Sequence, residues 1–406
     1  MMFSNGLYFT YSGALQGQKL PLAFLDLDAF DENIRYVRDI IEGTGRTIRV
    51  GTKSIRSEPL TKKIFELGGP NFKGLLTFTA EETAWLADKG YDDFIIAYPT
   101  VQDSDLDLII KMIRAGKAVR PMVDCEEHFY ILSKAAQAAK VEIETCLEID
   151  MAYRPFNSKK NHLGIRRSPL RTPEETVRLV KKVEEISSVK VKAVMGYEGH
   201  IAGTGDAVPG KAFKNKFLRL LKKRSVIELT KRRKAVVQAL LNEGIEVEVV
   251  NGGGSGSLIS TLKDSSVTEV TIGSGFYCPA LFHHFVEIKY QPAAFFAIQV
   301  VRFPEPGMIT CLGGGYPASG PAGPDKLPLP VLPVGLKYLP LEGAGEVQTP
   351  LMLPENCPDL KLGDPIIFQH AKGGELSERF NEIILLQESN VVGKALTYRG
   401  EGKAFL

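Results

Sequence analysis

The segment EVEVVNGGGSGSLISTLKDSSVTEVTIGSGFY, residues 246–277, contains two β-branched runs that each end in a glycine turn. The first turn is NGGGSGS (251–257) and the second is GSG (273–275). Glycine lets the backbone approach a ligand closely, and the N–H groups of such turns point at an anion. Two such turns after consecutive strands therefore indicate a phosphate site, although each turn alone is also typical of a simple tight connection.

The same alternation of strand and helix patterns extends back to residue 21. Amphipathic helical stretches separate the β-branched runs, and this order predicts βαβ units with parallel strands. The first βα turn (27–30) has no glycine, whereas an open dinucleotide-binding sheet would carry its glycine signature there. We therefore expect an α/β fold with a closed (β/α)8 TIM barrel. The runs begin at Pro21, Thr47, Gly74, Phe94, Ala118, Glu142, Lys190, Glu246 and Thr268.

After Phe285 the sequence loses its helical period and becomes a series of short β-like stretches broken by Pro and Gly. AAFFAIQVVRF (293–303) and DPIIFQH (364–370) are examples. We predict a barrel domain over residues 21–278 and a second, mainly β domain over residues 279–406. Residues 1–20 also look β-like, and we expect them to add strands to the β domain.

Composition narrows the class of protein. The chain has 406 residues and a formal charge of +2, which argues against a dedicated nucleic-acid binder. The basic segment 211–234 is interpreted as a solvated outer helix, with Leu218, Leu221 and Ile227 as its buried stripe. No apolar run is long enough to cross a membrane, the N-terminus does not resemble a signal peptide, and the five cysteines have no C-x-x-C spacing. These features predict a cytoplasmic protein with reduced thiols.

Lys53 is the candidate nucleophile. It follows the run TIRVGT (47–52), and the C-terminal ends of barrel strands are where active sites lie. At that end of the barrel Lys53 faces the two glycine turns. A lysine amine opposite a phosphate cup suggests pyridoxal phosphate, because the amine can form an imine with the aldehyde of that cofactor.

Longer motifs point to the same cofactor. They are PLAFLDLDAFDENI (21–34), VGTKS (50–54), HLGIR (162–166), AVMGYEGH (193–200), VNGGGSGS (250–257), IGSGFY (272–277) and LGDPIIFQH (362–370). In this order, and over nearly the whole chain, the sequence resembles the fold-type III pyridoxal-phosphate enzymes, the alanine racemase-like family. Within it, the chain is similar to the branch of D-threonine aldolases and D-serine dehydratases. The resemblance implies that the strand at 21–27 packs with the β domain, which leaves eight strands for the barrel, and that the enzyme is a homodimer.

The resemblance also implies roles for individual residues. Lys53 would carry the cofactor as a Schiff base, and Tyr197 and His200 join it as catalytic candidates. Arg154, Arg166 and Tyr197 would surround the pyridine ring or the substrate carboxylate, with surface salt bridges as the alternative for the arginines. His200 either orients a neighbouring group or is a structural core histidine. The residues expected to bind the cofactor phosphate are Gly253, Gly254, Ser255, Gly256, Gly273, Ser274, Gly275 and Tyr277.

One departure from the family concerns a metal ion. Metal-dependent members bind zinc or manganese through a histidine near the C-terminus and a Cys or Asp two residues later. Here the sequence is His370-Ala371-Lys372, and a lysine amine is a poor ligand because it is protonated at neutral pH. We expect no metal, with Lys372 as a catalytic candidate that polarises a substrate hydroxyl or binds an acidic side chain. A metal at His370 held by Glu375 or Glu378 is the alternative.

His283 and His284 are a second candidate for a metal pair. Adjacent residues of an extended stretch point to opposite faces, so we interpret these two histidines as structural or interfacial, with Phe282 and Phe285 as packing neighbours.

The expected function is a pyridoxal-phosphate lyase that acts on a small-molecule D-amino acid carrying a β-hydroxyl group. Aldol cleavage and deamination begin from the same activated substrate, and the sequence does not separate them. A racemase or epimerase of the same fold is the first alternative, with Tyr316 as the second base that it needs. A non-catalytic protein that binds the cofactor is the other.

Overall fold

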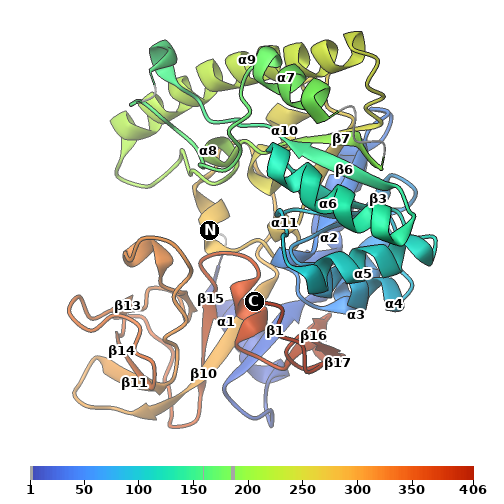
Figure 1. Cartoon of the computed structure of the whole chain (residues 1–406). Helices are drawn as coiled ribbons and strands as arrows, with labels where there is room; N and C mark the ends of the chain where they lie inside the picture. Colours follow the sequence, from blue (N-terminus) through green and yellow to red (C-terminus); the bar gives the residue numbers. More distant parts are fainter. Residues whose placement is uncertain (1–2, 159, 184–187) are drawn as a thin grey trace.

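The computed structural model describes residues 3–158, 160–183 and 188–406 and contains a closed barrel beside a mainly β domain (Figure 1). Eight parallel strands form the barrel in sequential order, so the predicted (β/α)8 fold with a second β domain is confirmed. The barrel strands are β2 (Thr47–Gly51), β3 (Phe72–Thr77), β4 (Phe94–Ile96), β5 (Val119–Val123), β6 (Ile143–Glu148), β7 (Val189–Gly196), β8 (Val249–Gly252) and β9 (Glu269–Ile272).

Helices connect these strands and cover the outside of the barrel. In α2, for example, the Asp26 side chain accepts a hydrogen bond from the Ala29 N–H at 3.0 Å and caps the first turn. Phe30, Ile34 and Ile41 on the same helix are fully buried, as the 3.6-residue period predicts. The helices are α2 (Leu27–Ile41), α3 (Glu58–Gly68), α4 (Ala80–Asp88), α5 (Asp103–Arg114), α6 (Glu126–Ala139), α7 (Pro173–Val183), α8 (Gly199–Ala202), α9 (Ala212–Asn242), α10 (Leu258–Thr261) and α11 (Ser274–Tyr277).

The β domain is a nine-stranded sheet that includes the first strand of the chain. Strand β1 pairs antiparallel with β10 and parallel with β16, which is why the first of the nine β runs is absent from the barrel. The strands are β1 (Leu22–Asp26), β10 (Ala294–Arg302), β11 (Met308–Leu312), β12 (Leu329–Leu332), β13 (Lys337–Tyr338), β14 (Gln348–Met352), β15 (Pro365–Gln369), β16 (Glu382–Gln387) and β17 (Asn390–Leu396).

The prediction of strands before residue 21 is wrong. Helix α1 (Asn5–Ala14) occupies this segment and packs on the β domain through its aromatic side chains. The Tyr11 hydroxyl donates to Asp26 at 2.6 Å, and its ring lies against Phe24 with centroids 5.2 Å apart. Ser4 caps this helix, because its side chain accepts a hydrogen bond from the Leu7 N–H at 3.2 Å.

Charged residues also lie inside the barrel. Arg49 on β2 is fully buried, and its guanidinium bonds Glu269 on β9 at 2.6 Å and Asp93 before β4 at 3.0 Å. The Asn251 amide donates to the same Glu269 at 2.8 Å. Such groups tolerate burial because each charge has a partner, and removing one partner leaves the other uncompensated.

The basic segment forms α9, a long outer helix along one side of the barrel (Figure 1), and of its expected buried stripe Leu218 and Leu221 are half-buried while Ile227 is not buried. Ile227 is 65% exposed, whereas Leu229, Arg233 and Val236 are buried. Arg233 points inward because it pairs with two buried carboxylates, so the inward face carries a charge that a hydrophobic pattern does not reveal. Among the described residues, no helix is both long and apolar enough to span a membrane.

The segment that joins the two domains includes His283 and His284. Both belong to a short 3-10 helix (Ala280–His284), so the expectation of an extended stretch is wrong. The His283 ring lies against Phe3 with centroids 6.0 Å apart, and the His284 carbonyl accepts from the Asp206 N–H at 2.6 Å. Burial lowers the pKa of His283 to about 4.

Candidate active site

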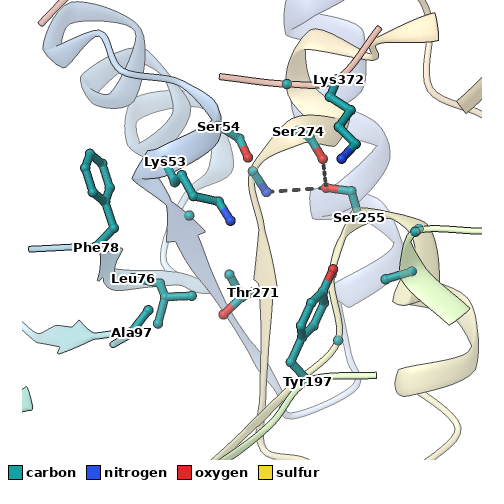
Figure 2. Close-up of a pocket in the computed structure, with 18 of the residues that line it drawn as sticks. Lys53, Ser54, Leu76, Phe78, Ala97, Tyr197, Ser255, Thr271, Ser274 and Lys372 are labelled. Carbon is teal, nitrogen blue, oxygen red and sulfur yellow. Dashed lines mark hydrogen bonds between the residues drawn. The ribbon is translucent and has the colours of Figure 1, made fainter. Parts of the chain in front are cut away.

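A cavity of about 330 Å³ lies at the C-terminal ends of the barrel strands, where the β domain covers them (Figure 2). Its volume falls within the range of small-molecule and cofactor sites. The cavity brings together most of the residues that the sequence singled out. The predicted residues that line it are Lys53, Tyr197, Gly253, Gly254, Ser255, Gly256, Gly273, Ser274 and Lys372.

The two glycine turns form one side of the cavity. The Ser255 hydroxyl accepts from the Gly275 N–H at 2.8 Å and lies 3.5 Å from the Ser274 hydroxyl, which ties the two turns together (Figure 2). Gly256 packs directly on the Ala202 carbonyl, and a Cβ at this position would overlap that oxygen. The result is a concave surface of small residues and serine hydroxyls, which suits a phosphate group.

A buried ion-pair network holds the first of these turns in place. The Glu198 carboxylate accepts from the Gly253 N–H at 3.0 Å and from the Thr261 hydroxyl at 2.6 Å. Arg233 bonds the same carboxylate at 3.1 Å and Asp264 at 2.7 Å. The backbone conformation of Gly253, with φ of 75°, is one that side-chain-bearing residues rarely adopt. Sequence reasoning missed this network because its members are far apart in the chain.

Lys53 lies on the opposite side, in the short turn that follows β2. Its Nζ donates to the Tyr98 hydroxyl at 3.3 Å and extends into the cavity (Figure 2). The backbone beneath it is packed tightly, since Gly374 from the β domain contacts the Lys53 carbonyl. Lys53 and the glycine turns therefore face one cavity, as the sequence predicts for a lysine opposite a phosphate cup.

Arg167, which the sequence reasoning did not select, is the arginine that lines the cavity. Its guanidinium lies over the rings of Tyr98 and Tyr197, 5.2 and 5.4 Å from their centroids, and bonds Glu148 at 3.1 Å. Burial raises the pKa of Tyr197, and the positive charge of Arg167 opposes that rise. The neighbouring Arg166 lies outside the cavity lining. The motif HLGIR ends at Arg166, so it does not include Arg167, the next residue in the chain.

Four more predicted residues lie behind the lining. Arg154 pairs with Asp150 at 2.9 Å. The Gly275 N–H donates to the Ser255 hydroxyl at 2.8 Å, and the Tyr277 hydroxyl donates to the Ile55 carbonyl at 3.0 Å. His200 Nε2 bonds the Ser225 hydroxyl at 2.6 Å, and burial lowers the pKa of its ring to about 4. These contacts are those of structural residues, and any catalytic role for them stays a prediction.

Tyr316, the second base that a racemase would need, is also outside the lining. Its ring lies against Phe296 and Phe380, with centroids 5.1 and 5.6 Å apart.

Around His370, the described residues do not bring three His, Cys, Asp or Glu ligand atoms within reach of one ion, although His370 Nε2 is buried without a hydrogen-bond partner. His370 is buried, its Nδ1 lies 3.2 Å from the Ala294 carbonyl, and burial lowers the pKa of its ring to about 4. Glu378 bonds Arg56 at 2.6 Å, whereas Glu375 accepts from the Ser319 N–H at 2.8 Å with one oxygen and its other oxygen is buried without a partner. Within the described ranges, one group of three or more His, Cys, Asp or Glu side chains is close enough to share an ion, and it is Asp124, Cys125 and His128.

Residues 25–280, more than half of the chain, match the family described as alanine racemase, N-terminal domain. The chain belongs to the alanine racemase N-terminal domain family. The fold-type III pyridoxal-phosphate family that the motifs resemble is therefore confirmed.

Two curated relatives match part of the chain at low sequence identity. The chain is 25% identical over 254 residues to the 3-hydroxy-D-aspartate aldolase of Paracoccus denitrificans (strain Pd 1222). The matched residues cover 63% of this chain and 59% of that protein. A second protein of that name from Paracoccus denitrificans is 26% identical over 185 residues and matched over 44% of its length. The chain thus spans about three fifths or less of the curated relatives that it matches.

Solved structures share the fold over almost the whole chain. The D-threonine aldolase from Filomicrobium marinum superimposes with a TM-score of 0.79 at 19% identity, covering 95% of this chain and 96% of that one. The D-threo-3-hydroxyaspartate dehydratase from Delftia sp. HT23 gives 0.73 at 15% identity, covering 95% and 98%. At these identities the likeness establishes the fold of both domains.

Proposed function

We propose that this protein is a pyridoxal-phosphate-dependent lyase that acts on a D-amino acid with a β-hydroxyl group. The observation that carries the proposal is the single cavity in which Lys53 faces two joined glycine turns. The names of the relatives support a lyase, since they are an aldolase of 3-hydroxy-D-aspartate, an aldolase of D-threonine and a dehydratase of threo-3-hydroxyaspartate.

The residues of the cavity fit the cofactor. Ser255, Gly256, Gly273 and Ser274 would hold its phosphate, because they offer hydroxyl and backbone groups on a concave surface. Lys53 would hold its aldehyde carbon covalently. When bound, pyridoxal phosphate supplies an electron sink for the pair released at the substrate Cα.

The side chains around the reacting atoms then have distinct tasks. Lys53, once displaced by the substrate amine, is the group positioned to move a proton at Cα, and the Tyr98 hydroxyl 3.3 Å away orients its Nζ. Arg167, fixed by Glu148 and by two aromatic rings, offers a guanidinium for the substrate α-carboxylate. Gly373 lines the cavity from the β-domain side, where it packs against Ser274.

Two outcomes are compatible with this arrangement. Breaking the Cα–Cβ bond gives glycine and an aldehyde, whereas losing the β-hydroxyl gives a keto acid and ammonia. We infer from the family alone that the enzyme is a homodimer.

The test is a product assay on the protein loaded with pyridoxal phosphate. A panel of D-amino acids with and without a β-hydroxyl is incubated with the enzyme, and aldehyde, keto acid and the inverted isomer are measured. The proposal predicts aldehyde or keto acid from β-hydroxy substrates. Inverted isomer as the main product would support a racemase instead, and no product from any substrate would support a protein that binds the cofactor without catalysis.

A further inference from the structure

The side chains that line the cavity carry an excess of positive charge. Three cationic side chains line it, Lys53, Arg167 and Lys372, and across the described residues its lining contains no Asp or Glu. The proposed function accounts for the first two, as the covalent site and the α-carboxylate site. Lys372 has no assigned task.

Lys372 is held next to the reactive lysine by the fold. It follows β15, and the next residue, Gly373, is packed so closely that a Cβ there would lie 2.7 Å from the Ser274 Cβ. Gly374 contacts the Lys53 carbonyl. Figure 2 shows Lys372 entering the cavity from the β-domain segment and Lys53 entering from the barrel. Lys372 therefore lines the same cavity as Lys53, from the β-domain side.

The ammonium lacks a counter-ion. Its Nζ donates to the Ser319 carbonyl at 2.8 Å, and no carboxylate of the described chain lies within ion-pair distance of it. Asp325, whose pKa Lys372 helps to lower, bonds Lys326 instead. Glu375 uses one oxygen on the Ser319 N–H. A half-buried ammonium with free donors and no paired carboxylate is stabilised by an anion that arrives with the ligand.

We propose that Lys372 binds the side-chain carboxylate of the substrate, so that the enzyme selects acidic β-hydroxy-D-amino acids over neutral ones. This inference rests on the proposed function, which leaves the substrate side chain open. The chemical class is a four-carbon amino dicarboxylic acid with a hydroxyl at Cβ. The same ammonium takes the place in the sequence where a metal ligand would otherwise stand, and the interaction that it offers is a direct charge-assisted hydrogen bond.

The test compares two substrates that differ mainly in the group at Cβ. The kcat/KM values of 3-hydroxy-D-aspartate and D-threonine are measured with wild type, Lys372→Gln and Lys372→Arg. We expect Lys372→Gln to lower the ratio of acidic to neutral kcat/KM by roughly 10- to 100-fold, the range of one charge-assisted bond. Lys372→Arg should keep most of the preference because it keeps the charge.

Lys326→Gln is the matched control. Lys326 lies beside Gly320, as Lys372 does, but it pairs with Asp325 and is not part of the cavity lining. This variant should keep the wild-type ratio. An unchanged ratio in Lys372→Gln would overturn the inference. So would an equal loss for both substrates, which would place Lys372 at the hydroxyl group, or a weaker affinity for pyridoxal phosphate alone, which would place it at the phosphate.

Calorimetry gives a readout that does not depend on turnover. D-malate and D-lactate carry the same hydroxy acid, but only D-malate has a second carboxylate. Wild-type protein loaded with pyridoxal phosphate should bind D-malate at least roughly tenfold more tightly, and Lys372→Gln should lose that difference. If no β-hydroxy-D-amino acid is turned over while D-malate is still preferred, the proposed function fails and only the carboxylate-binding role of Lys372 is supported. If β-hydroxy-D-amino acids are turned over with no preference for 3-hydroxy-D-aspartate or for D-malate, the proposed function stands and this inference fails.

Discussion

The barrel wall and the β-domain wall of the cavity differ in what fixes their polar groups. On the barrel wall, Lys53 and the turns at Ser255 and Ser274 directly follow strands, so the closed barrel alone brings them to one end. On the β-domain wall, Lys372 comes from a strand of another sheet, and it reaches the cavity through packing of Gly373 and Gly374 against barrel residues. The barrel wall provides a general cofactor site, whereas the β-domain wall is free to set the choice of substrate.

The largest expected effect is on the barrel wall. Lys53→Ala removes the amine that binds the cofactor and moves the proton at Cα, so we expect kcat/KM to fall by about 10³-fold or more. Lys372→Ala should retain covalent loading and measurable turnover. Steady-state kinetics with both variants checks the difference between the walls. Equal losses of kcat/KM in the two variants would show that the barrel wall and the β-domain wall do not differ in their roles.

Most of the barrel wall could be predicted from the sequence, because its residues lie in short segments whose own pattern identifies them. Lys53, Ser255 and Ser274 stand at strand ends that period and glycine turns reveal, and a parallel barrel places all such ends together. The supporting ion pairs around Glu198 and Arg233 could not be predicted, because they join helix, loop and strand positions far apart in the chain.

The β-domain wall could be predicted from the sequence less well than the barrel wall. The spacing His370-Ala371-Lys372 says nothing about which of the two side chains reaches the cavity, and the structure buries His370 while Lys372 lines the wall. Helix α1 was missed for a related reason, since its aromatic residues are buried by tertiary contact with Phe24 and Phe295.

The second prediction concerns the glycine turns of the barrel wall. Gly256→Ala places a methyl group on the Ala202 carbonyl, and overpacking of this kind costs about 1–3 kcal/mol. If the strain appears in the cofactor-bound state, affinity for pyridoxal phosphate falls roughly 10- to 100-fold, measured by titration of the apoprotein. Gly393→Ala on β17 is the control, because nothing lies within 4 Å of its Cβ position. Equal affinities in both variants would show that the turn is not tight around its ligand.

The third prediction concerns His200, behind the barrel wall. Burial lowers the pKa of this ring to about 4, so below about pH 6.5 the unfolded chain takes up a proton that the folded chain does not. Folding stability should therefore fall between pH 6.5 and pH 4, by up to about 3 kcal/mol from this residue.

His200→Gln should flatten that part of the pH profile of the unfolding free energy, measured with urea, and leave turnover within about threefold of wild type. A large loss of kcat with an unchanged pH profile would instead assign His200 to the chemistry.

The smallest expected effect is that of a chelator, which tests the β-domain wall. Because the described residues around His370 do not bring three His, Cys, Asp or Glu ligand atoms together, treatment with EDTA should change kcat/KM by less than about twofold. Any zinc or manganese that the protein retains should disappear in His128→Ala, a variant of the other possible ligand group. Tight metal binding that survives in His128→Ala and raises turnover severalfold would contradict this account.

The most direct test of the central claim is to find which pocket lysine carries the cofactor. The protein is loaded with pyridoxal phosphate, reduced with sodium borohydride, digested and mapped by mass spectrometry. The account predicts the reduced cofactor on the peptide that contains Lys53, with Lys372 unmodified. The cofactor on Lys372, or on a lysine outside the cavity, would contradict it.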